Sequence, residues 1–224
     1  MTDPLPLTEL LAAVGAAFER TSLGLRRWDD PHAGEMPADA ENSRCLDPTK
    51  WRIIGARAEA WTIALIDLGH ATVERDATVG WRSSGCPAVT RTDVLQPVAA
   101  GALSLAVGRS RIEDVDDAGV VLGAVRDGEL VDVVSFLPDC GCDACDWGSQ
   151  PELDLLDEHI GSVVSGRFRR LTRGESVITV FADGVGAQNL PDARRMRRSG
   201  ELDRILANPT GWHELSGSPW SPAQ

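Results

Sequence analysis

The chain has 224 residues, a mass of 24.0 kDa and a formal net charge of −12, from 34 acidic and 22 basic side chains. A chain of this length buries about 70% of the surface that its unfolded form exposes, so it can fold without disulfides. Its 42% hydrophobic and 25% charged residues exclude a disordered, collagen-like or coiled-coil protein. The negative charge repels phosphate backbones, which argues against nucleic acid as a partner.

Membrane insertion and secretion are also disfavoured by the sequence. The longest nearly uncharged apolar stretch, residues 98–108, has eleven residues, whereas a membrane-spanning helix needs about 20. The first residues contain Asp3 and no basic side chain before Arg20, so the cationic start of a secretory signal is missing. We therefore expect a cytoplasmic protein with no membrane partner.

The first third of the chain has the pattern of two helices joined by a long loop. Apolar residues at helical spacing predict a first helix over residues 7–25. Residues 28–48 carry Pro, Gly, Asp and Asn without a period, which is typical of a long surface loop. From Trp51 to Leu68 apolar side chains recur every three or four residues and predict a second helix, which Gly69 can end.

The middle of the chain has the pattern of an antiparallel meander. Residues 71–73 predict a short strand, and a turn-rich segment follows up to about residue 97. The dipeptide Asp127-Gly128 favours a tight hairpin turn between the last two strands of the meander. The predicted meander strands are residues 103–112, 119–125 and 130–137.

The last third begins with a third predicted helix. This helix runs from Ser149, where Ser149 and Glu152 fit a capping box, to Gly166. Two strands, a last helix and a tail follow, and the tail holds Trp212 and Trp220, which are large enough to dock it onto the body. These four segments are residues 168–171, 177–182, 191–207 and 208–224.

The order of elements indicates an α+β fold. The strands come in consecutive pairs rather than alternating singly with helices, which favours one mainly antiparallel sheet with packed helices. We therefore expect residues 1–224 to form a single domain. The sequence has no nucleotide-binding loop, zinc-protease pair or hydrolase elbow, so no nucleotide cofactor is expected.

The most informative segment is PDCGCDACD, residues 138–146, which holds Cys140, Cys142 and Cys145 between a predicted strand and a predicted helix. Two thiolates in a C-x-x-C turn can bind one cation, and Gly141 allows the backbone to bend so that Cys140 joins them. Clustered cysteines in a reducing cytoplasm indicate metal or redox chemistry rather than a disulfide framework. The spacing predicts a site for zinc or another thiophilic ion.

A structural zinc site needs four ligands, and the segment provides three. The distant candidates are Cys45, Cys86, His70, His159 and His213. His159 lies ten residues along the predicted helix, a rise of about 15 Å, so we expect it to be out of reach. Cys86, in a turn-rich segment, and His213, in the tail, are the possible fourth ligands, and the sequence does not decide between them.

Three functions are compatible with this sequence. The first is a binding or interaction protein in which the three cysteines hold a structural zinc ion. The second is an enzyme that uses the same cysteines, either with an ion whose open position activates water or with thiols that exchange disulfides. The third is an acidic inhibitor or immunity-type protein that binds a basic protein partner. A cysteine turn that binds nothing also stays open.

The string PDCGCDACDWG, residues 138–148, leads into an acidic helical segment and resembles a family of actinobacterial proteins of unknown function. The tail from Trp212 to Trp220 is similar to the end of the same family. The resemblance implies a bacterial cytoplasmic protein, and it assigns no activity and no catalytic residue.

Overall fold

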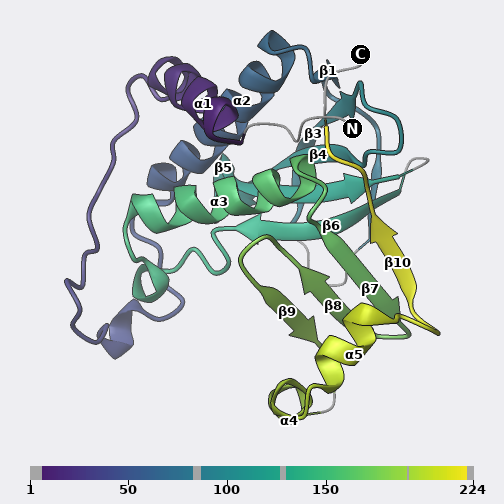
Figure 1. The fold of residues 1–224 in the computed structure, drawn as a ribbon. Helices are drawn as coiled ribbons and strands as arrows, with labels where there is room; N and C mark the ends of the chain where they lie inside the picture. Colours follow the sequence, from purple (N-terminus) through teal and green to yellow (C-terminus); the bar gives the residue numbers. More distant parts are fainter. Residues whose placement is uncertain (1–6, 83–86, 127–129, 191, 221–224) are drawn as a thin grey trace.

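The computed structural model describes residues 7–82, 87–126, 130–190 and 192–220. Three long helices pack on one face of a six-stranded sheet, and a four-stranded sheet adjoins them (Figure 1). The long helices are α1 (Leu7–Thr21), α2 (Arg52–Asp67) and α3 (Ser149–Val164). The predicted α+β class is confirmed, although there are two sheets where the strand pattern predicted one.

The six-stranded sheet contains the predicted meander. Its strands are β1 (Ala71–Glu74), β2 (Gly80–Arg82), β3 (Val89–Pro97), β4 (Ser104–Ile112), β5 (Val115–Val125) and β6 (Leu130–Leu137). The strand order is β1-β3-β4-β5-β6-β2, and all neighbours are antiparallel except β2, which runs parallel to β6. Strand β2 therefore covers the outer edge of β6. The predicted turn dipeptide Asp127-Gly128 lies outside the described residues.

The second sheet gathers the end of the chain. Its strands are β7 (Arg169–Arg173), β8 (Ser176–Val180), β9 (Val185–Gln188) and β10 (His213–Ser216), in the antiparallel order β10-β7-β8-β9. Two short helices, α4 (Ala193–Arg198) and α5 (Glu201–Ala207), precede β10. The prediction of one helix over residues 191–207 is wrong, because Gly200 adopts φ +65 and interrupts it.

The prediction of a turn-rich segment up to residue 97 is also wrong, because this segment contains β2 and β3. Strand β3 has a polar middle, which hides the alternation that identifies a strand. The buried Asp93 carboxylate accepts a hydrogen bond from Arg75 at 2.8 Å, and the buried Thr92 hydroxyl accepts one from Trp81 Nε1 at 3.2 Å. These partners allow polar side chains in a buried strand.

One apolar core joins the three helices to the six-stranded sheet. The predicted seam of α2 lies in this core, where Trp51 and Trp61 are fully buried. Near the C-terminus, Trp220 is also fully buried, and its indole N–H donates to the Leu103 carbonyl at 3.0 Å. Helix α1 ends at Thr21 rather than near residue 25, and the Ser22 hydroxyl donates to the Phe18 carbonyl at 2.6 Å. Among the described residues, no helix has both the length and the apolar character needed to cross a bilayer.

Candidate metal centre

The three clustered cysteines lie on the connection between β6 and α3, in and around a single 3-10 turn, η3 (Asp143–Cys145). The sulfur atoms of Cys140, Cys142 and Cys145 all lie within 4.8 Å of one another. Gly141 adopts φ +77, the left-handed conformation that a turn here requires. Within the described ranges, these cysteines are the only group of three or more His, Cys, Asp or Glu side chains placed to hold a metal ion.

Cys142 and Cys145 hold their protons unequally. Burial opposes ionisation of Cys142, but hydrogen bonds from Cys140, Cys145 and the Ser43 backbone lower its pKa to about 7. The hydrogen bond that Cys145 makes to Cys142, together with burial, raises the pKa of Cys145 to about 12. Cys142 therefore ionises before Cys145. A bound cation would replace the shared protons and favour the thiolate form of all three side chains.

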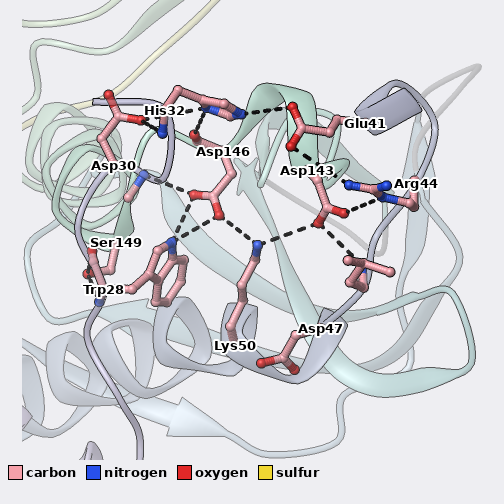
Figure 2. A network of polar contacts seen from close by, with 12 residues as sticks. Trp28, Asp30, His32, Glu41, Arg44, Asp47, Lys50, Asp143, Asp146 and Ser149 are labelled. Carbon is pink, nitrogen blue, oxygen red and sulfur yellow. Dashed lines mark hydrogen bonds and ion pairs between the residues drawn. The ribbon is translucent and has the colours of Figure 1, made fainter. Parts of the chain in front are cut away.

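Residues 28–50, which include the predicted surface loop, fold directly onto the cysteine connection (Figure 2). This segment contains two 3-10 turns, η1 (Asp39–Glu41) and η2 (Pro48–Trp51). The Asp143 backbone N–H donates to the Arg44 carbonyl at 2.6 Å, and the Ser149 backbone N–H donates to the Trp28 carbonyl at 3.0 Å. The loop is therefore held both at the middle of the cysteine connection and at the start of α3.

Asp146 is the central acceptor of this contact. Its side chain is 3% exposed. The carboxylate accepts hydrogen bonds from Trp28 Nε1 at 2.8 Å, from Lys50 Nζ at 2.6 Å and from the Gly148 backbone N–H at 2.9 Å. Three donors from two distant parts of the chain thus satisfy one buried carboxylate.

Lys50 is the only lysine of the chain, and it is mostly buried. Its ammonium group lies 4.9 Å from the centre of the Trp51 ring and 5.7 Å from that of Trp28. The two rings meet edge to face, with their centres 5.4 Å apart. The ammonium group is therefore held by the Asp146 carboxylate and by two aromatic faces.

Asp143 forms a second anchor for the loop. It accepts hydrogen bonds from Arg44 Nε at 2.9 Å and from the Leu46 backbone N–H at 3.2 Å, and Lys50 Nζ lies 3.8 Å away. Burial opposes its ionisation, but these hydrogen bonds and the Lys50 charge lower the pKa of Asp143. The ionised Asp143 side chain therefore stabilises the fold above the usual aspartate pKa. This contribution is lost as the pH falls through the lowered pKa of Asp143.

His32 links the loop to the backbone of Asp146. Its Nδ1 lies 3.1 Å from the Asp146 carbonyl oxygen, and its Nε2 lies 3.4 Å from Glu41. The His32 backbone N–H also donates to the Asp30 carboxylate at 2.8 Å. Backbone and side-chain groups of Asp146 therefore both contact the loop (Figure 2).

The predicted capping box at the start of α3 is wrong. The N-cap is Gly148, and the Ser149 hydroxyl instead accepts a hydrogen bond from the Trp28 N–H at 3.2 Å and donates one to the Trp28 carbonyl at 3.1 Å. Gly148 adopts φ +90, and the backbone of the loop passes very close to it. A Cβ at this position would lie 2.8 Å from the Asp30 backbone nitrogen.

Replacing Gly148 by alanine is expected to lower the free energy of unfolding by about 2–3 kcal/mol, through backbone strain and the clash with the loop. Gly174 is the matched control. It also has a positive φ, at +58, but a Cβ there meets nothing within 4 Å, so we expect a loss of about 1 kcal/mol. Urea unfolding measures both. Equal losses for the two variants would contradict the close packing of the loop.

The structure describes one of the two proposed fourth ligands. Cys86 lies outside the described residues. His213 opens β10 in the second sheet, where it is exposed and pairs with Thr172, and it does not join the group of three cysteines. His159, which was expected to be out of reach, does not join the cysteine group, and its Nδ1 lies 2.9 Å from the Ser135 hydroxyl. Cys45 follows Arg44, whose side chain donates to Asp143. Burial raises the pKa of the Cys45 thiol.

Glu152, in the first turn of α3, has one buried carboxylate oxygen without a hydrogen-bond partner. Burial, followed by the charges of Asp146 and Asp139, raises the pKa of Glu152 to about 7. A folded-state pKa above the unfolded value makes the protein lose stability as the pH rises from about 4.5 through 7.

The variant Glu152→Gln removes this charge and keeps the shape of the side chain. We expect it to be more stable than the wild type at pH 8 by about 1–2 kcal/mol, a value reduced for partial solvent screening. At pH 4.5 the two proteins should differ by less than about 0.5 kcal/mol. Thermal melts across this range test the prediction, and a constant difference at both pH values would contradict it.

Sequence reasoning identified the cysteines but not the groups that surround them. Asp146, Lys50 and Trp28 form the network, and the sequence predicted none of them as a metal ligand or catalytic residue. One signal was available in the sequence, because a single lysine next to a tryptophan stands out in a chain whose other basic residues are all arginine.

The comparisons with known proteins assign no activity to the chain. No curated protein and no solved structure matches the chain. A family model does match, over residues 14–224, and it is described as a family of unknown function. The match covers almost the whole chain, including the cysteine cluster and the loop that contacts it, and the chain belongs to this family of unknown function, DUF6226.

Proposed function

We propose that this chain is a cytoplasmic binding protein whose long loop is held in place by a structural zinc ion at Cys140, Cys142 and Cys145. The observation that carries the proposal is the mutual approach of the three sulfur atoms, all within 4.8 Å. Tetrahedral zinc with bonds of about 2.3 Å separates its thiolate ligands by about 3.8 Å. The three cysteines can therefore reach this geometry with small side-chain rotations.

Of the two expected fourth ligands, we favour Cys86. Its chain neighbour Pro87 lines a cavity of about 220 Å³ together with Cys140. His213 belongs to a strand of the other sheet. The proposal therefore predicts that Cys86→Ser weakens zinc binding and that His213→Ala does not.

One feature favours a structural ion over thiol exchange. The three cysteines are flanked by Asp139, Asp143 and Asp146, and the negative charge of these residues favours a bound dication. A reducing cytoplasm would keep such thiols free to bind metal.

The binding role is supported by a cavity beside the loop. Trp28, Lys50, Leu25 and Arg26 are among the residues that line this cavity, which has a volume of about 530 Å³. Volumes of this size are typical of ligand sites. Trp28 and Lys50 both donate hydrogen bonds to Asp146, which directly follows Cys145. The cysteine connection therefore helps to position this wall of the cavity.

Elemental analysis of protein purified without added metal or chelator tests the proposal, with free thiols counted on the same sample. We expect about one zinc per chain, and slow reaction of the three clustered thiols until the protein is unfolded or a strong chelator is added. Cys45→Ser is the control, because this cysteine lies outside the group, and it should keep its zinc. Metal-free protein whose cysteines all react freely would overturn the proposal and favour the thiol-exchange alternative.

A further inference from the structure

A second cavity, of about 310 Å³, lies between the two sheets and is lined by residues of β6, α3, β7, β8 and β9. Figure 1 shows these elements side by side, with β8 and β9 next to β6 and α3. We refer to this cavity as the intersheet cleft. Among its lining residues are Val133, Phe136, Leu155, His159, Arg170 and Phe181. None of them takes part in the cysteine cluster or the loop network.

Arg170, on β7, is the cation of the intersheet cleft. Its Nη1 donates to the Val133 carbonyl at 2.8 Å, but its Nε is buried and has no hydrogen-bond partner. Among the described residues no carboxylate forms an ion pair with it, whereas Arg57 pairs with Asp157 at 2.5 Å. Burial lowers the pKa of Arg170, and the nearby charge of Asp132 opposes this shift without forming an ion pair. A largely buried guanidinium without a paired carboxylate is costly, and a bound anion would lower that cost.

The rest of the lining is largely apolar and aromatic. The His159 ring stacks on Phe181, with ring centres 4.1 Å apart. Burial lowers the pKa of His159 to about 4, so this side chain is neutral at pH 7 and adds no second cation. Leu155 is 38% exposed although it is a large apolar residue, and it lies on the lining. These surfaces favour a ligand with a flat apolar body.

Asp139 limits the charge of that ligand. It lies on the lining of the same cleft, immediately before Cys140. A single cation together with this acid disfavours a ligand with two negative charges, such as a phosphate monoester. A planar guanidinium matches the two oxygens of one carboxylate.

We propose that the intersheet cleft binds a small monocarboxylate with a flat apolar body, its carboxylate on Arg170 and its body against Phe136 and Phe181. This inference goes beyond the proposed zinc site and does not depend on bound metal.

The probe is 2-naphthoate, compared with its uncharged analogue 2-naphthamide, by calorimetric titration of the full chain. We expect 2-naphthoate to bind at least tenfold more tightly than the amide, because only the carboxylate pairs with the guanidinium. Arg170→Met should weaken 2-naphthoate at least tenfold. Arg167→Met makes the same change in net charge at an exposed position before β7 and should leave binding unchanged.

Equal affinity for the acid and the amide, no binding at millimolar concentration, or unchanged binding by Arg170→Met would each overturn the proposal. Tighter binding of inorganic phosphate than of 2-naphthoate would also overturn it. If Arg170→Met does not fold, the site is tested by the amide chemical shifts of the wild type. Adding 2-naphthoate should then change the shifts of residues in β6 and β8, and changes confined to the loop would overturn the proposal. Zinc measured on the same samples separates this result from that for the metal site.

Discussion

Replacing Asp146 by asparagine is expected to lower the free energy of unfolding by about 2–4 kcal/mol, because the mostly buried Lys50 ammonium group loses its partner at 2.6 Å and keeps only the Asp143 carboxylate at 3.8 Å. The carboxylate accepts from Trp28, Lys50 and Gly148, and it offers no donor. An asparagine side chain of the same shape turns one of the two oxygens into an NH₂ group that faces these donors. The loss should be measured by urea unfolding at pH 7.

A double-mutant cycle with Lys50→Met identifies the cause of this loss. Asp146 is buried, Lys50 is mostly buried, and the two side chains are in contact. The sum of the two single losses in unfolding free energy should therefore exceed the loss of the double variant. The coupling should reach about 1–3 kcal/mol. Asp154→Asn, at an exposed position of α3, is the control and should cost less than about 0.5 kcal/mol. Additive effects at Lys50 and Asp146 would show that the ion pair contributes little to the attachment of the loop.

The sequence predicted the elements whose contacts are local, and it did not predict those that depend on partners far away in the chain. The seam of α2 and the meander β4-β5-β6 were predicted because each depends on the spacing of neighbouring apolar residues. Strand β3 was missed because Thr92 and Asp93 are polar and buried, and their partners lie on other segments. A local pattern cannot show that a polar side chain has a buried partner.

The candidate site shows the same limit more strongly. The three cysteines lie within six consecutive residues, so their spacing alone predicted a cluster. The loop that covers them was predicted as a surface segment because its composition is polar and irregular. Its attachment depends on Trp28 and Asp146, which are 118 residues apart in sequence. Ser149 illustrates the consequence, because a hydroxyl that fitted a capping box locally instead bonds to the Trp28 backbone.

Replacing Cys142 by serine is expected to abolish zinc binding and to lower the melting temperature by roughly 8–16 °C. Cys142 is the buried member of the cluster and the thiol that accepts hydrogen bonds from both other cysteines and from the loop backbone at Ser43. A ligand present at a thousand times its dissociation constant stabilises a protein by about 4 kcal/mol. For a domain of this size each kcal/mol changes the melting temperature by about 2–4 °C.

The controls determine whether the loss comes from the metal or from packing. A strong chelator should lower the melting temperature of the wild type towards that of Cys142→Ser, and it should leave the variant unchanged. Cys45→Ser should melt like the wild type and keep its response to the chelator. Hydrogen exchange of the Leu46 amide, which donates to Asp143, should accelerate in Cys142→Ser and in chelated wild type alike, because both would lack the proposed ion. A wild type that melts at one temperature with and without chelator would show that the Asp146 and Asp143 contacts hold the loop by themselves, and that the cysteines have a different role.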